Sequence, residues 1–306
     1  MTAAAAPGAP AMPLPIEARG LTKSFGRLTA VDSLDLAVHP GEVFGFLGPN
    51  GAGKTTTIRL LLGFINPSAG TCTLFGRSGW EPGARRRVGY LPAELAIDRR
   101  YTASDVIEFF GELRGGYDRQ FTRDLLDRFA LDPSRPLGDL STGNRRKVGI
   151  VQAFMHRPDL LILDEPTSGL DPLLQQEFHR LVREEASRGA TVFLSSHVLP
   201  EVEALASRVA ILRKGRLVTV ASIAELRRRA RQRIDLFTAT PPPRGLFETL
   251  PGVRQVTYHD GGVQLLVEGS VDPVVKAAAG LTVERIHTPG QDLEDLFLEY
   301  YQEAAP

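Results

Sequence analysis

A glycine-rich stretch that ends in lysine and threonine constrains this chain more than any other feature. The stretch is GPNGAGKTT, from Gly48 to Thr56; it follows the apolar run EVFGFL and leads into the helical pattern TTIRLLLGF. It matches G-x-x-x-x-G-K-[ST] in the strand–loop–helix setting that this pattern requires. A glycine-rich turn with a chance lysine fits that setting poorly. The chain is therefore predicted to fold around a loop that binds the phosphates of a nucleotide.

The residue types of this loop suit phosphate chemistry. Glycines allow backbone N–H groups to point at phosphate oxygens, and the N-terminus of the following helix adds partial positive charge. Lys54 is predicted to reach the β- and γ-phosphates, and the hydroxyl of Thr55 to bind Mg²⁺. The residues predicted to contact the nucleotide here are Gly48, Pro49, Asn50, Gly51, Ala52, Gly53, Lys54, Thr55 and Thr56.

Short apolar runs alternate with helical patterns along the first two thirds of the chain. Their unbroken apolar character indicates strands buried on both faces, which is typical of an α/β domain with a mainly parallel sheet. Sheets of this kind bind ligands beyond the carboxyl ends of their strands. We therefore expect functional residues directly after these runs. The predicted strands are Glu42–Leu47, Val88–Leu91, Leu160–Leu163, Thr191–Ser196 and Val209–Leu212.

Two of these runs end in side chains that can act on a phosphate. LLILDEP carries Asp164, predicted to hold Mg²⁺ directly or through water, and Glu165, predicted to polarise the attacking water. Alone, this pair could be an ordinary acidic turn. FLSSH ends in His197; a lone histidine is usually structural, but this one stands where a γ-phosphate contact belongs. The catalytic candidates are Glu165, His197 and Lys54.

Helical periodicity without strand signal covers about residues 100–156 and indicates a helical subdomain inserted into the α/β domain. After residue 225 the patterns follow the order βαββαβ, which is ferredoxin-like. Its first helix is predicted near Gly245–Leu250. We therefore expect a tail at residues 1–14, an α/β domain at 15–225 and a small α+β domain at 226–306. A final amphipathic helix, QDLEDLFLEYYQE, closes the chain; its apolar face holds Leu293, Leu296, Phe297 and Tyr300.

Composition excludes several classes of protein. The formal net charge is zero, which gives no general reason to bind nucleic acid, and no such partner is expected. The single cysteine, Cys72, rules out an internal disulfide framework and fits a reducing compartment. No run approaches the roughly 20 apolar residues of a membrane span, and the start MTAAAAPGAPAMPLP lacks the basic flank of a signal peptide. The expectation is a cytoplasmic protein that reaches the membrane only through a partner.

Together, the motifs resemble those of ATP-binding cassette (ABC) ATPases. GPNGAGKTT, LSTGN, LLILDEP, SGLDP and FLSSH occur over residues 16–225 in the order and spacing of that family. The resemblance implies ATP as ligand, with Phe25 stacking on adenine; the alternative for Phe25 is a core aromatic. It also implies that Ser141, Gly143 and Asn144 of the signature LSTGN contact the γ-phosphate held by a second cassette. Asp171 would lie in the loop that connects the two cassettes, and His197 would be the switch histidine.

Two departures from the family pattern concern the site. The signature has Thr142 and Asn144 where glycine and glutamine are usual, while Ser141 and Gly143 are kept. The family also carries a glutamine after the strand VGYLP, where it touches Mg²⁺ and water. Here Ala93 and Glu94 follow instead. Either Glu94 replaces the glutamine as an oxygen ligand, or the direct contact is lost.

The resemblance predicts an ATPase that works as a dimer, either with itself or with a paralogous cassette, and drives a multi-span membrane permease. The helix LEDLFLE near the C-terminus is similar to that of cassettes from exporters with a separately encoded permease, so drug, antibiotic or lipid export is expected. The subunit would lie on the cytoplasmic face of the membrane.

Two alternatives remain. The chain could be a cassette ATPase without a transport role, or a regulatory module that binds but does not hydrolyse nucleotide. The basic run Arg227–Arg233 could face lipid or permease, or simply solvent.

Overall fold

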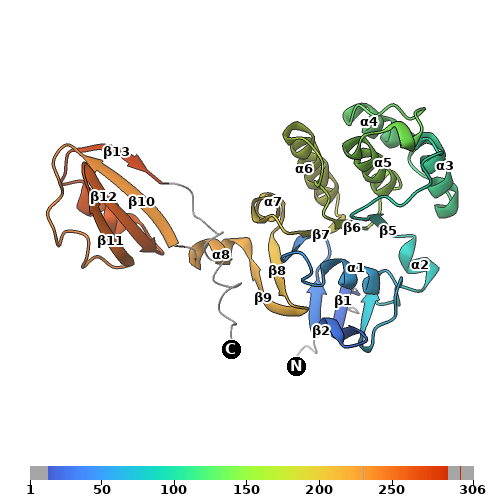
Figure 1. The fold of residues 1–306 in the computed structure, drawn as a ribbon, viewed down its shortest axis with the longest axis horizontal. Coiled ribbons are helices and arrows are strands. Elements are labelled where there is room, and N and C mark those ends of the chain that lie inside the picture. Colours follow the sequence, from blue (N-terminus) through green and yellow to red (C-terminus); the bar gives the residue numbers. More distant parts are fainter. Residues whose placement is uncertain (1–12, 230, 289–296, 298–306) are drawn as a thin grey trace, which may run out of the picture. The chain divides into compact units, whose positions relative to one another are not determined.

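The computed structural model describes residues 13–229, 231–288 and 297. They divide into two compact units, the first ending at Val220 and the second beginning at Ala221 (Figure 1). None of the helices in these described ranges combines the length and apolar composition that crossing a bilayer requires.

A six-stranded sheet forms the centre of the first unit. The pairings that join β5, β6, β7, β3 and β8 are all parallel, and every residue of β3, β6 and β7 is buried. This confirms the predicted parallel sheet and its position in the core. Its strands, in spatial order, are β5 (Val88–Leu91), β6 (Leu160–Asp164), β7 (Thr191–Ser196), β3 (Val43–Leu47), β8 (Arg208–Arg213) and β9 (Arg216–Ser222).

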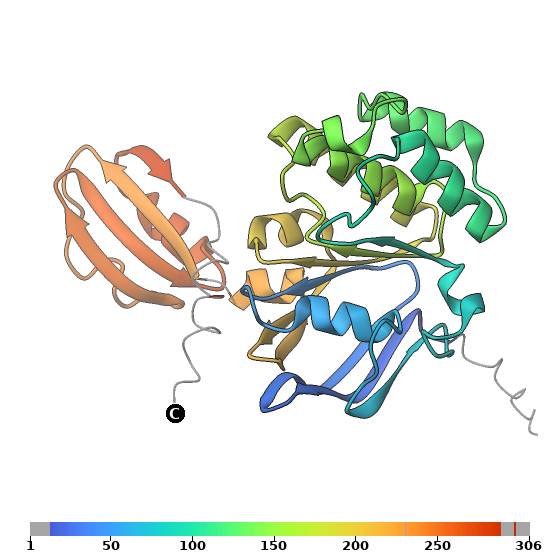
Figure 2. The ribbon, with the colours of Figure 1, turned by 45° about the vertical axis from the view of Figure 1, so that its right-hand side comes forward.

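A second, three-stranded antiparallel sheet was not predicted. It has the order β2 (Leu28–Val38), β1 (Ile16–Phe25) and β4 (Ala69–Leu74). Helix α1 (Lys54–Leu61) contacts β2 and β4 as well as β6, and lies between the two sheets (Figure 2). The apolar side chains of both sheets and of α1 form one core cluster, which fixes the direction of α1 relative to the end of β3.

Helices α3 (Ala103–Arg114), α4 (Arg119–Arg128) and α5 (Thr142–Phe154) gather at one end of the first unit (Figure 1). Thr102 begins α3 with a capping box, and Gly115 ends it in the left-handed conformation. Helix α5 also contacts β5, so the helical region is joined to the sheet. The short elements α2 (Pro82–Arg85) and η1 (Leu137–Asp139) lie in the connections. Helices α6 (Pro172–Ser187) and α7 (Leu199–Leu205) contact β7.

The second unit begins with α8 (Ile223–Arg229) and contains a four-stranded antiparallel sheet in the order β11-β12-β10-β13, the ferredoxin-like strand order. Its elements are β10 (Arg231–Thr238), β11 (Val253–His259), β12 (Gly262–Glu268), α9 (Asp272–Ala278) and β13 (Val283–His287). The predicted final helix lies outside the described residues, except for Phe297, which is helical and buried.

The helix predicted near Gly245–Leu250 is wrong, because the structure has successive turns there. The run of prolines from Pro241 to Pro243 removes backbone donors and favours extended backbone. Gly245 then takes a left-handed φ of 91°. The residues that follow continue as turns and a bend that lead directly into β11.

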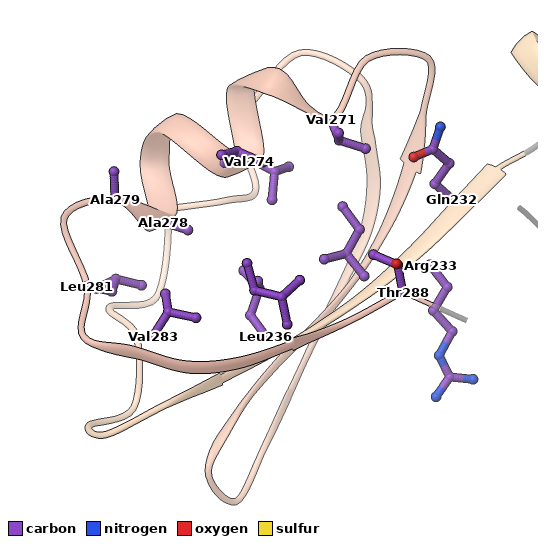
Figure 3. Close-up of a pocket in the computed structure, with 13 residues that line it drawn as sticks. Gln232, Arg233, Leu236, Val271, Val274, Ala278, Ala279, Leu281, Val283 and Thr288 are labelled. Atoms are coloured by element: carbon purple, nitrogen blue, oxygen red, sulfur yellow. The ribbon is translucent and has the colours of Figure 1, made fainter. Parts of the chain in front are cut away.

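An apolar cavity of about 640 Å³ lies between α9 and strands β10 and β13 (Figure 3). Side chains such as Leu236, Val274 and Val283 line it. It contains no residue of the predicted nucleotide site, and its apolar lining does not suit a polyphosphate.

Candidate active site

The phosphate-binding loop connects β3 to α1, as predicted. Gly53, the residue before α1, has a φ of 106°, and a Cβ added there would lie 2.3 Å from the backbone oxygen of Ala30. Only glycine fits both conditions without strain. The N–H of Gly48 donates to the carbonyl of Ser196 at 3.2 Å, which ties the loop to the end of β7. The loop is therefore fixed against the edge of the sheet where β6 and β7 also end.

Lys54 lies at the centre of this arrangement with only 6% of its surface exposed. Its Nζ donates to the carbonyls of Gly48 at 2.6 Å and Pro49 at 3.3 Å. The same atom is 3.2 Å from Oε1 of Glu165. The loop lysine and the acidic end of β6, more than a hundred residues apart in sequence, thus form an ion pair.

Thr55 and Asp164 also meet. The Thr55 hydroxyl donates to Oδ2 of Asp164 at 2.9 Å, and the Ser195 hydroxyl donates to Oδ1 at 2.5 Å. Asp164 is fully buried. Ser195 was not predicted from the sequence, where its only signal is a serine near the end of a buried strand, two residues before His197. A hydroxyl and a carboxylate side by side are the hard oxygen donors that suit Mg²⁺, which takes few protein ligands beside phosphate oxygens.

His197 and Glu165 form the third contact of the site. The histidine Nδ1 lies 2.7 Å from Oε2 of Glu165. Glu165 has a φ of 49°, a left-handed backbone that a residue with a Cβ adopts rarely. This turn aims its side chain back across the sheet edge toward both Lys54 and His197.

A cavity of about 570 Å³ opens beside these groups. Its lining includes Glu165, His197 and Asn50, together with Thr142 of the signature and Glu94. Glu94 is exposed at this cavity. The structure thus brings five of the predicted regions, from five separate parts of the chain, to one place.

Comparison with known proteins agrees with this geometry. The family described as "ABC transporter" matches residues 31–168. The bacitracin transport ATP-binding protein BcrA of Bacillus licheniformis is 36% identical over 93% of this chain and 96% of its own length. The Nod factor export ATP-binding protein I of Cupriavidus metallidurans is 34% identical over the same shares. A solved structure of the ATP-binding subunit of an ABC transporter is similar at a TM-score of 0.65 and 29% identity, covering 70% of this chain and 92% of that one. The chain belongs to the ABC transporter family.

As an ABC transporter ATP-binding subunit, the protein is an ATPase. The segment LSTGN, which resembles the signature sequence of this family, lies at the start of α5. Ser141 is the N-cap of α5, and its Oγ accepts from the N–H of Asn144 at 3.2 Å. A Cβ on Gly143 would lie 2.9 Å from the carbonyl of Gly169, in the SGLDP segment. Ser141 is exposed and does not line the cavity of its own chain, whereas Thr142 does. The signature serine therefore faces solvent.

The two remaining predicted residues lie at the periphery. Phe25, at the end of β1, is 51% exposed, and Lys23 Nζ lies 5.0 Å from its ring centroid. Phe25 is thus available to a ligand and is not a core aromatic. Asp171 caps α6, and its Oδ1 accepts from the N–H groups of Leu173 and Leu174 at 3.0 Å each. In the ATP-binding subunit this carboxylate stabilises a helix start.

Proposed function

We propose that the loop, the end of β6 and His197 form one half of an ATP hydrolysis site that drives an exporter. The observation that carries the proposal is the convergence of Lys54, Glu165 and His197 within hydrogen-bonding distance at the carboxyl edge of the sheet. Backbone N–H groups of Gly48–Thr56 and the N-terminus of α1 would hold the phosphates. Phe25 would stack on the adenine.

Transfer of the γ-phosphoryl group of ATP to water, which breaks the phosphoanhydride bond to the β-phosphate and releases ADP, depends mainly on position and charge. Glu165 would orient the attacking water and accept its proton, and Lys54 would exchange its contact with Glu165 for the phosphate oxygens. His197 would keep the Glu165 carboxylate aligned and contact the γ-phosphate. Thr55 and Asp164 would hold Mg²⁺, which supplies charge neutralisation when bound.

Glu94 is proposed to act at the same cavity through its charge. Its carboxylate would offer an oxygen where the family places an amide, close to Glu165 and His197. A carboxylate binds divalent cations more strongly than an amide does, and it repels other carboxylates. The alternative remains that direct contact is lost, and Glu94→Gln distinguishes the two through the Mg²⁺ dependence of turnover.

A second cassette, either a copy of this chain or a paralogue, is proposed to complete the site. Ser141, Gly143 and Asn144 at the start of α5 form an anion site of hydroxyl, amide and helix end. Because Ser141 is exposed and outside its own cavity, the proposed ligand is the γ-phosphate of the partner cassette. Asp171, capping α6, would stand at the same interface.

The proposed partner in the membrane is a multi-span permease that holds this subunit on the cytoplasmic face. The region from Tyr101 to Arg114 is the proposed docking face, where Phe109 and Leu113 are exposed. The printed names of the two relatives concern bacitracin transport and Nod factor export; on that likeness the cargo is a drug, antibiotic or lipid. Co-purification with a multi-span membrane protein tests this, and recovery with ribosomes or DNA instead would contradict it.

ATP turnover by site variants tests the hydrolysis mechanism. Glu165→Gln should lower kcat by at least about 100-fold, the contribution of a general base, and leave ATP binding in place. Lys54→Ala should remove ATP binding as well. Glu284→Gln, at an exposed carboxylate of β13, is the control and should turn over ATP like the original chain. Equal rates for Glu165→Gln and the control would contradict the proposed mechanism.

A further inference from the structure

One buried guanidinium joins the separate parts of the site through backbone hydrogen bonds. Arg146 is 5% exposed and lies in α5, in the segment RRK that follows the signature. Its side chain donates to five backbone carbonyl oxygens, two of them after the end of β5 and three at the end of β6. The acceptors are the carbonyls of Pro92, Ala93 (3.0 Å), Asp164 (2.7 Å), Glu165 and Pro166 (3.0 Å).

These contacts use the full donor capacity of the side chain. A guanidinium has five N–H donors in a planar fork, which matches the five carbonyls. Burial lowers the pKa of Arg146 to about 10, and the nearby Asp164 and Glu165 carboxylates oppose this effect. Arg146 therefore stays protonated at neutral pH.

The carbonyls it binds surround the strained residue of the site. Glu165 has a left-handed φ of 49°, a conformation that costs about 1–2 kcal/mol for a residue with a Cβ. Arg146 holds the carbonyls of Asp164, Glu165 and Pro166, so it fixes the peptide units on both sides of that φ. The other branch of the fork reaches Ala93, next to Glu94.

We infer that Arg146 is a positioning residue: it holds the Glu165 turn in its hydrolytic conformation and links that turn to α5, whose first residues follow Ser141. This inference rests on the proposed function, since it assigns to Arg146 an effect through Glu165. A movement of α5 when the signature binds phosphate would then be transmitted to the water-orienting carboxylate. Sequence alone does not single out Arg146, because Arg145 and Lys147 beside it are equally basic.

Arg146→Lys tests the inference, because an ammonium has the charge but cannot reach two strand ends at once. We expect kcat to fall by about 10- to 100-fold, the scale of losing an outer partner that orients the groups of a site. The KM for ATP and its Kd by titration calorimetry should change less than about twofold, because Arg146 donates to no residue of the loop Gly48–Thr56. Arg128→Lys, which disturbs the ion pairs with Glu177 and Glu184, is the control and should keep its turnover.

A double-mutant cycle separates positioning from a general structural role. In single-turnover measurements, Arg146→Lys should cause little further loss when Glu165 is already glutamine. Equal losses in both backgrounds, or unchanged turnover of Arg146→Lys, would overturn the inference.

Thermal denaturation checks that each variant folds. If Arg146→Lys does not fold, Arg146→Gln takes its place. If neither folds, the inference is also overturned, since Arg146 then serves the fold. If the original chain itself does not hydrolyse ATP, the proposed function fails instead.

Discussion

At the scale of single residues, the backbone of Gly53 matters to the site as much as the side chain of Lys54. Gly53→Ala should impose about 1–2 kcal/mol of left-handed strain and a clash with the Ala30 carbonyl, 2.3 Å from the new Cβ. The loop must shift, so we expect the ATP affinity to fall by about tenfold or more, or at least 1.4 kcal/mol. Titration of ATP measures it.

Gly189→Ala is the matched control for this prediction. Gly189 has a similar φ of 99°, but a Cβ there would meet nothing within 4 Å. This variant should lose stability from strain alone and bind ATP normally. Equal ATP affinities for the two variants would mean that the close approach at Gly53 is unimportant.

A buried histidine away from the site gives a pH dependence of stability. His156 bonds the carbonyl of Val88 through Nε2, and its Nδ1 has no partner. Burial, with a smaller contribution from Arg114, lowers its pKa from 6.5 to about 4. Between these two pKa values the imidazole takes up a proton in the unfolded chain but not in the folded one. The free energy of unfolding therefore falls as the pH drops from 6.5 to 4, by about 3 kcal/mol.

His156→Gln should flatten this part of the profile, because glutamine keeps an N–H donor but does not titrate. Urea unfolding at several pH values between 7 and 4 measures the slope. The same slope in both proteins would assign the acid sensitivity to other groups.

Among single residues, the sequence predicted those functional side chains that stand at the end of a buried strand. Asp164, Glu165 and His197 were predicted to be functional because each stands at the end of a buried strand. In the structure Asp164 and Glu165 contact the loop, and His197 contacts Glu165. Ser195 and Arg146 were missed for a physical reason. Their role lies in buried hydrogen bonds to groups distant in sequence, and a hydroxyl or guanidinium carries no sign of its future partner.

At the scale of elements, Ser141 caps α5 and is also proposed to bind a phosphate, and comparison with a second cap variant separates the two roles. Ser141→Arg removes the cap, worth about 1 kcal/mol, and puts a bulky cation where the partner phosphate is proposed to bind. ATP binding to the loop should persist while turnover is lost. Thr102→Ala, which removes the cap of α3, is the control and should lose similar stability but keep turnover.

Lost ATP binding in Ser141→Arg, with dimerisation preserved, would contradict the placement of the signature on the partner's nucleotide. Turnover equal to that of Thr102→Ala would show that Ser141 is only a cap.

Buried strands were predictable and partly exposed ones were not. Strands β3, β6 and β7 are buried throughout and stand out as apolar runs. Strand β1 mixes buried and partly exposed positions and is interrupted by register shifts, so its alternation is broken. The order of strands across the sheet could not be predicted from the sequence either, because it depends on how distant apolar faces pack together and not on any local pattern.

At the scale of the whole molecule, the incomplete signature contact predicts that ATP joins two subunits. Glu165→Gln should bind ATP without hydrolysing it and so accumulate as a dimer, measured by light scattering at saturating ATP and Mg²⁺. The Glu165→Gln, Ser141→Arg double variant should stay monomeric under the same conditions. A monomeric Glu165→Gln protein would count against a shared site.

The position of β3 between β7 and β8 also has a consequence for how the protein is made. The phosphate-binding loop leaves the ribosome early, but the two strands that pair with β3 end only at Ser196 and Arg213. Until those residues emerge, β3 has no strand to pair with, and its backbone N–H and C=O groups lack their partners in the sheet. Long-range pairings of this kind form slowly and leave chains open to aggregation. The part of the sequence that is easiest to recognise therefore acquires its final surroundings only long after it has been synthesised.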